Sequence, residues 1–223
     1  MYPNLSKKIS KLPLVRRFGR LALRTLGISS LSRDKKRRLK LAKSTLPEKI
    51  PLDASFRSGF LVFHDPNNPL IARGEIFESD VRSAIYTLFF LDRQRGNTPR
   101  FADIGANIGL HSLAVKEKFP ETEVVAFDPS PFSWKYLKLT LEHNDIEGIK
   151  LMPIALGNSE GTADFYAWGK SSSGDSLRNT GRQPNTPFSV IKVPIRKFDA
   201  LPENDGVTVI KMDCEGAEVS IIQ

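Results

Sequence analysis

Two short stretches of the chain combine carboxylates with glycines at spacings that suit ligand binding. The first is FADIGANIGLH at residues 101–111, and it contains Asp103. The second is KMDCEGAE at residues 211–218, which carries Asp213 and Glu215. Carboxylates can take a proton from a substrate, accept hydrogen bonds, or bind a divalent cation. Both stretches are therefore candidates for a binding or catalytic site.

The first stretch predicts a strand, a tight turn and a helix. An apolar run ends on Asp103, small residues follow at Gly105, Asn107 and Gly109, and an apolar-periodic segment comes next. Gly105 would form the turn, Gly109 would let the helix pack closely on the strand, and the helix would present free N–H groups to a ligand. A dinucleotide site needs Gly-x-Gly-x-x-Gly instead. The spacing resembles the S-adenosylmethionine (AdoMet) loop of class I methyltransferases.

The remainder of the chain alternates predicted strands with predicted helices. This alternation indicates an α/β fold with a doubly wound parallel sheet and ligands at the carboxyl ends of its strands. Two β-like segments flanking a Ser/Gly/Asn-rich loop at 169–187 interrupt the alternation and predict a β-hairpin insertion. We expect strands at 60–63, 71–77, 101–104, 123–128, 149–153, 162–168, 188–198 and 207–210, and helices at 78–91, 107–118 and 131–143.

Asp128 ends the second core strand, 23 residues after Gly105. Its two oxygens could accept hydrogen bonds from both ribose hydroxyls of a nucleoside. The alternative is that Asp128 caps the helix that follows Pro129.

Charge divides the chain into two parts. Residues 1–49 hold 15 Lys and Arg against Asp34 and Glu48, a net +13, whereas residues 50–223 hold 18 basic and 23 acidic residues, a net −5. We expect a basic arm over 1–49, helical or partly disordered, and one domain over 50–223 with its core at 100–223. The arm could contact an anionic membrane or dock on its own domain. Because the domain is acidic, we expect no nucleic acid partner.

The chain has one cysteine, Cys214, so no internal disulfide or multi-cysteine zinc site can form. Neither a signal peptide nor an apolar run near the roughly 20 residues of a membrane span is present. We therefore expect a cytoplasmic protein with, at most, peripheral membrane contact.

Seven motifs, in order and with fitting gaps, resemble the FkbM family of AdoMet-dependent methyltransferases. They lie at 103–109, 126–129, 144, 155–157, 175–177, 199 and 211–218. The resemblance spans roughly residues 75–223. It implies a class I methyltransferase, Rossmann-like fold and methylation of a hydroxyl on a sugar or other small molecule. The family commonly has Glu in place of Asp128, and its pattern continues beyond residue 218 into further strands, so we expect a sheet that is incomplete at its C-terminus.

The resemblance also implies roles in holding the cofactor. Asp103 would hold the methionine amine of AdoMet, directly or through water, and Gly105, Asn107 and Gly109 would shape the loop. Ala155 would border the adenine ring, although the acid more usual in that region is missing here. The alternative is that the glycines serve only the turn.

Asp213 and Glu215 end the strand nearest the expected methyl position. Either could act as the general base or as a ligand of a divalent cation. Catalysis with and without such a cation stay open as alternatives. In the structural alternative, Glu215 and Glu218 support the loop and the next helix. His111 is expected to pack or hydrogen-bond rather than act as a base, and Cys214, between two acids, is not expected to be a nucleophile.

Two other functions stay open. An NAD-dependent oxidoreductase would share the fold but requires the other glycine spacing. A truncated module that binds AdoMet or is inactive, recruited through its basic arm, would need no catalytic residue.

Overall fold

The computed structural model describes residues 52–53, 60, 62–64, 78–167, 175–177 and 188–223. All of them lie in one compact unit that runs from Pro47 to Gln223. The predicted arm at 1–49, the predicted strand at 71–77 and most of the 169–187 loop lie outside the described residues.

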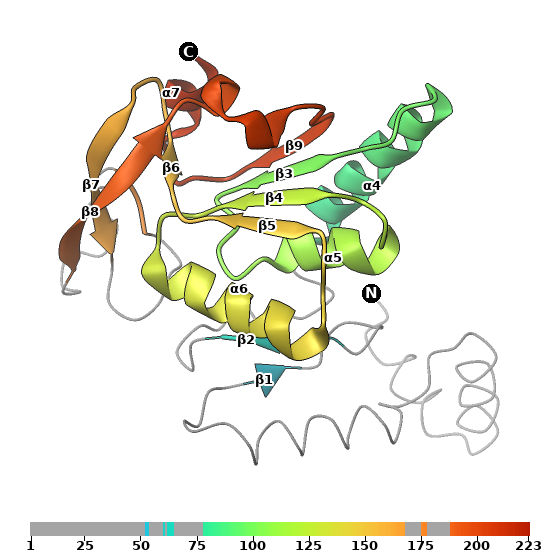
Figure 1. The fold of residues 1–223 in the computed structure, drawn as a ribbon, viewed down its shortest axis with the longest axis horizontal. Coiled ribbons are helices and arrows are strands. Elements are labelled where there is room, and N and C mark those ends of the chain that lie inside the picture. The colour runs from blue at the N-terminus through green and yellow to red at the C-terminus, as the bar shows by residue number, and fades with distance from the viewer. Residues whose placement is uncertain (1–51, 54–59, 61, 65–77, 168–174, 178–187) are drawn as a thin grey trace, which may run out of the picture. The chain divides into compact units, whose positions relative to one another are not determined.

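A parallel sheet forms the centre of the described part of the chain, with strands in the order β5-β4-β3-β9 (Figure 1). Three strands are added in one direction, and the chain then returns to place the fourth on the other side of the first. This is the order of a doubly wound sheet. The direction in which successive strands are added reverses at β3, between β3 and β9, although all four strands are parallel. The α/β, Rossmann-like prediction is therefore confirmed. The strands are β3 (Phe101–Ile104), β4 (Val124–Phe127), β5 (Ile149–Met152) and β9 (Val209–Met212).

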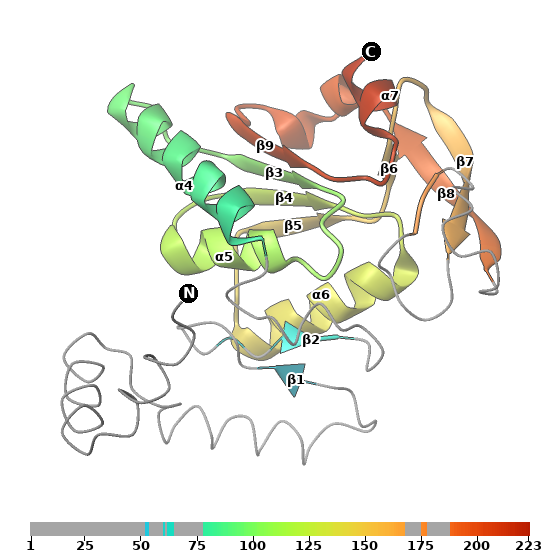
Figure 2. The ribbon, with the colours of Figure 1, turned by 180° about the vertical axis from the view of Figure 1, so that it is seen from behind.

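Successive side chains of these strands point to opposite faces of the sheet, and both faces are covered. Phe101, Val124 and Val209 pack with residues of helices α4 (Ser79–Gln94) and α5 (Leu110–Lys118). Figure 2 shows α4 on the near side of the sheet. Helix α6 (Pro131–Asn144) packs farther along the same face. The other face is covered by residues of η2 (Phe198–Ala200) and α7 (Glu218–Ile222) and by Leu201, which joins η2 to η3 (Pro202–Asn204).

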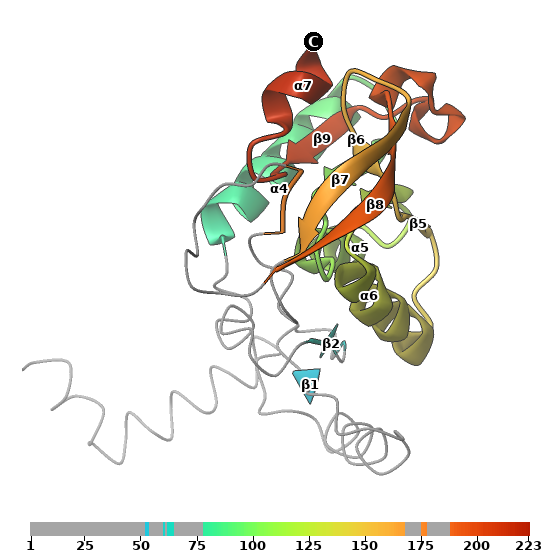
Figure 3. The same ribbon diagram turned by 90° about the vertical axis from the view of Figure 1, so that its left-hand side faces the viewer.

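The predicted β-hairpin insertion is present as a second sheet at one side of the first (Figure 3). Strands β7 (Gly161–Ala167) and β8 (Ser189–Arg196) pair antiparallel, and β6 (Ala155–Leu156) joins β8 in parallel. Alternate hairpin residues such as Phe165 and Val193 are buried against Ala155. A further antiparallel pair, β1 (Leu52–Asp53) and β2 (Val62–Phe63), is tied to α6 where Phe63 N donates to Thr140 Oγ1 at 3.0 Å.

Two of the differences from the predicted boundaries affect the site. Helix α5 starts at Leu110 rather than at 107, because Asn107 and Gly109 adopt positive φ angles of 52° and 82°. The last strand lies at 209–212 rather than 207–210, because Val207 N is held in a turn by Asn204 O. This two-residue shift places Lys211 inside β9, directly opposite Asp103 of β3.

Strand β9 lies at one end of the described sheet. Ile210 on this strand is 46% exposed, whereas its neighbour Val209 is buried. No helix in the described residues has the length and apolar character needed to cross a membrane.

Candidate active site

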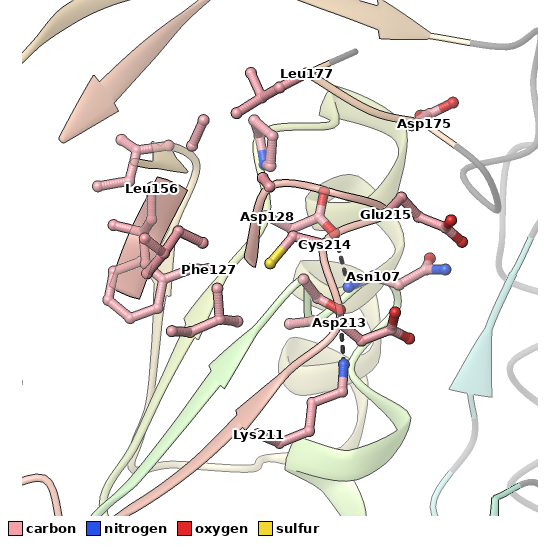
Figure 4. A pocket seen from close by; sticks show the side chains of 18 of the residues that line it. Asn107, Phe127, Asp128, Leu156, Asp175, Leu177, Lys211, Asp213, Cys214 and Glu215 are labelled. Carbon is pink, nitrogen blue, oxygen red and sulfur yellow. Dashed lines mark hydrogen bonds between the residues drawn. The ribbon is translucent and has the colours of Figure 1, made fainter. Parts of the chain in front are cut away.

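A cavity of about 240 Å³ opens at the carboxyl ends of β3, β4 and β9, at the point where the strand order reverses (Figure 4). Doubly wound sheets bind their ligands at this position. Of the predicted site residues, those that line the cavity are Gly105, Asn107, Asp128, Ala155, Asp213 and Glu215.

The Gly105 turn is pressed against the end of β9. Gly105 N and Ala106 N both donate to Phe127 O at 2.9 Å, which fixes the turn to β4. Gly105 has a φ of 71°, and a Cβ at this position would stand 1.8 Å from the carbonyl oxygen of Asp213. Only glycine fits at this position. The two candidate stretches, 101–111 and 211–218, are therefore in direct contact here.

Asp128 joins the turn to the start of α6. Its Oδ2 accepts from Asn107 N at 2.7 Å, and its Oδ1 accepts from Ser130 N at 2.8 Å. Burial, and to a smaller extent the nearby charge of Asp175, raise the pKa of Asp128 to about 6 against the effect of these hydrogen bonds. An ionised carboxylate offers about four acceptor positions, so Asp128 can still accept from a ligand. The predicted ribose role and a role in starting α6 are compatible.

Asp103 is not among the residues that line the cavity, and its predicted role of holding the methionine amine, directly or through water, stays a prediction. Its side chain is completely buried, and its Oδ2 accepts from Ser112 N at 3.1 Å and Ser112 Oγ at 2.7 Å. Its Oδ1 lies 3.3 Å from Lys211 Nζ. The physical reason is the strand register, which directs Asp103 under α5 together with Lys211.

Lys211 is a cavity residue that the sequence interpretation missed. Its Nζ donates to Gly105 O at 3.0 Å in addition to pairing with Asp103. Burial favours the neutral amine, but the carboxylates of Asp103 and Asp213 prevail and raise the pKa of Lys211 above its ordinary value. Lys211 therefore stays cationic and holds the turn. The signal was its position two residues before Asp213, because residues two apart in extended backbone point to the same side.

Gly109 also lies away from the cavity wall. A Cβ at this position would stand 2.4 Å from Cδ1 of Leu137 in α6, and the predicted close packing of α5 on the strand stays a prediction. The close approach is therefore between the start of α5 and α6.

The loop after β9 carries the two predicted catalytic carboxylates. Asp213 is exposed and Glu215 is half-buried, with a left-handed φ of 53° at Glu215. Glu218 supports this loop, as its Oε1 accepts from Cys214 N at 2.7 Å and its Oε2 accepts from Gly216 N at 2.9 Å. The structural alternative therefore describes Glu218, and Glu215 is one of the residues that line the cavity. Burial, with Glu218, raises the pKa of Cys214 to about 12, so its thiol is a poor nucleophile.

His111 lies at the cavity next to an acid that the sequence interpretation did not select. Its Nε2 is 2.7 Å from Oε2 of Glu78, the residue that precedes α4. The imidazole is therefore engaged in a hydrogen bond, the role favoured for it.

The cavity wall is acidic on one side and apolar on the other (Figure 4). Lys211 is its one Lys or Arg within the described residues. The described residues contain no group of three or more His, Cys, Asp or Glu placed to hold a metal ion. The carboxylates are those of Glu78, Asp128, Asp175, Asp213 and Glu215, and the apolar side includes Phe127, Ile154, Leu156, Phe165 and Leu177.

A family model described as the methyltransferase FkbM domain matches residues 103–223, which is more than half of the chain. The chain belongs to the FkbM methyltransferase family. The matched FkbM segment contains the Gly105 turn, Asp128 and the loop after β9, and it leaves out Glu78 among the cavity residues named above.

Two curated methyltransferases are similar to parts of this FkbM chain. The methyltransferase sdnD of Sordaria araneosa is 40% identical over 67 residues, which are 30% of this chain and 26% of that protein. Methyltransferase 1 of Beauveria bassiana is 23% identical over 144 residues, which are 54% of this chain and 56% of that protein. The chain thus spans about a quarter and about half of the lengths of these relatives.

Among solved structures, a Podospora anserina methyltransferase with bound SAH is 17% identical. The match covers 56% of this FkbM chain and 51% of that chain, with a TM-score of 0.28.

Proposed function

We propose that this FkbM domain binds AdoMet in the cavity and transfers its methyl group to a hydroxyl of a sugar or other small molecule. The observation that carries the proposal is the charge of the cavity. Its wall combines five carboxylates with one lysine, and that lysine is already paired with Asp103 and Gly105 O. AdoMet carries a sulfonium and an ammonium group against a single carboxylate, so it is a net cation whose charge complements this wall.

The apolar side of the cavity suits the nucleoside. Ile154, Ala155 and Leu156 follow β5 and could border an adenine ring. Asp128 stands at the end of β4, where an acid can accept from the ribose hydroxyls. This arrangement supports the predicted roles of Ala155 and Asp128.

The acidic side suits a cation better than a pyrophosphate. Two phosphates of NAD would face Asp128, Asp213 and Glu215, and Lys211 would have to leave Asp103 to meet them. The arrangement therefore favours AdoMet over NAD, in agreement with the glycine spacing.

Bound AdoMet supplies an electrophilic methyl group, and the residues of the chain position the acceptor. Asp213 and Glu215 lie at the end of β9, on the acidic side. Either carboxylate could orient the acceptor hydroxyl and take its proton as the new C–O bond forms. The acceptor is proposed as a small molecule, and contact of the basic arm with anionic lipid and a cytoplasmic location stay predictions.

Calorimetric titration tests the cofactor assignment. At pH 7.5 we expect one AdoMet to bind per chain and NAD to bind far more weakly. At pH 5, about one unit below the raised pKa of Asp128, most of this carboxyl is protonated and is a weaker hydrogen-bond acceptor for a ribose hydroxyl. We therefore expect AdoMet affinity to fall about tenfold between pH 7.5 and pH 5.

The control for the pH effect is Asp128→Asn, which removes the titrating group. This variant should bind AdoMet weakly at both pH values, with a flatter pH profile. Tighter binding of NAD than AdoMet, or an AdoMet affinity of the unmodified chain that rises at pH 5, would contradict the assignment.

A further inference from the structure

The segment from Asp175 to Leu177 is a part of the cavity wall that the reaction described above does not use. It lies between β7 and β8, and Asp175 and Leu177 both line the cavity. Asp175 is only 8% exposed and Ser176 only 1%. A carboxylate buried to this degree requires polar partners, so its surroundings indicate its role.

Hydrogen bonds fix this segment to two other parts of the cavity wall. Tyr166 N donates to Ser176 O at 2.8 Å, and Ser176 N donates to Tyr166 O at 3.1 Å, which joins the segment to β7. Ser176 Oγ donates to the carbonyl oxygen of Glu215 at 2.9 Å, which joins it to the loop after β9. In Figure 4, Leu177 lies on the side of Leu156 and Asp175 on the side of Glu215.

Ser130 connects Asp175 to Asp128. Ser130 Oγ donates to Asp175 Oδ2 at 2.9 Å, while Ser130 N donates to Asp128 Oδ1 at 2.8 Å. Two carboxylates are thus held beside one buried serine, where their negative charges repel each other. A ligand that offers two adjacent O–H donors would satisfy both acids, and a ribose diol has this chemistry.

We propose that Asp175 is a second ribose ligand, so that Asp128 and Asp175 each accept a hydrogen bond from one hydroxyl of the AdoMet ribose. This assignment rests on the proposed function, because it requires AdoMet in the cavity. It makes the hairpin insertion part of the cofactor site and makes both ribose hydroxyls specificity determinants.

Asp175→Asn is the informative variant because asparagine has the same shape and its amide oxygen can still accept from Ser130 Oγ. The substitution removes the repulsion between the two acids, so the free protein should melt at the same or a higher temperature. A residue that is only structural would lower the melting temperature. The matched control on the same hairpin is Asp164→Asn, which alters an exposed pair with Lys192.

The test is calorimetric titration with S-adenosylhomocysteine, which has the same ribose, and with its 2′-deoxy and 3′-deoxy analogues. The unmodified chain should bind S-adenosylhomocysteine at least about tenfold more tightly than either analogue, as expected for a hydrogen bond to a charged group. Asp175→Asn should lower the affinity for S-adenosylhomocysteine about tenfold. It should leave nearly unchanged the affinity for the analogue that lacks the hydroxyl bound by Asp175. Asp164→Asn should change none of the three affinities.

Equal weakening of all three ligands by Asp175→Asn, or no weakening at all, would overturn the ribose role of Asp175. Ser130→Ala gives a second measurement, since it keeps both acids and removes only the hydroxyl that holds Asp175. It should produce the same ligand-dependent pattern at smaller size, and a uniform loss would again overturn the role. If the unmodified chain binds neither S-adenosylhomocysteine nor AdoMet, the proposed function fails and the ribose role of Asp175 fails with it.

Discussion

Gly105→Ala is expected to weaken AdoMet binding by more than about 100-fold and to lower the free energy of unfolding by about 3–5 kcal/mol. The left-handed conformation of residue 105 disfavours any side chain, by roughly 1–2 kcal/mol. The larger part of the effect is steric, because the new methyl group would stand 1.8 Å from Asp213 O, a backbone atom that cannot rotate away. Relief requires separation of the turn from β9, which deforms the cavity.

Gly96→Ala is the matched control for this prediction. Gly96 has a similar φ of 82°, but a Cβ there would meet nothing within 4 Å. Urea unfolding should therefore show a loss of only about 1 kcal/mol, and AdoMet binding should not change. If the two alanine variants lost equal stability, the contact between Gly105 and the end of β9 would not be the reason for glycine at this position.

Lys211→Met is expected to destabilise the chain by about 3–5 kcal/mol, the scale for removal of one partner from a buried ion pair. The substitution leaves Asp103 fully buried with no opposite charge, and it removes the hydrogen bond from Lys211 Nζ to Gly105 O. The double variant Asp103→Asn with Lys211→Met removes both charges and should recover a large part of the loss. Urea unfolding of the unmodified chain, the two single variants Asp103→Asn and Lys211→Met, and the double variant gives the coupling energy between the two side chains directly.

The control for Lys211 is Lys192→Met, which removes the cation from an exposed pair with Asp164. Its side chain is 71% exposed, so the expected loss is below about 1 kcal/mol. Two results would contradict the buried pair as the support of the turn. One is a similar loss of unfolding free energy in the two methionine variants, and the other is a double variant that is less stable than Lys211→Met.

The sheet could be predicted from the sequence because its signals are local. Apolar runs, the turn at Gly105 and the acid at Asp128 each lie within a few residues of the strand they end. Alternation with helices then indicates a parallel sheet, and the structure gives its strand order as β5-β4-β3-β9. The boundaries were less accurate, since the turn at Val207 and the left-handed Asn107 depend on hydrogen bonds and conformations that composition does not reveal.

The missed site residues depend on pairing between distant strands or segments. Lys211 and Asp103 meet through the register of β3 and β9, and a two-residue error in one strand end hides that meeting. Glu78 and His111 come together across 33 residues, and Asp175 and Ser130 across 45. No sequence period encodes such contacts, so the sequence could predict the cofactor side in part but not the full set of cavity carboxylates.

The most direct test of the proposed function is transfer of a labelled methyl group from AdoMet to a panel of sugars and hydroxylated small molecules, with the labelled atom located by mass spectrometry and NMR. The label should appear on a hydroxyl oxygen. Asp213→Asn or Glu215→Gln should lower the rate about 100-fold or more, as for loss of a general base, while AdoMet affinity stays within about threefold. A label found on nitrogen or carbon, or no labelled product with any hydroxyl compound, would contradict hydroxyl methylation by this FkbM domain.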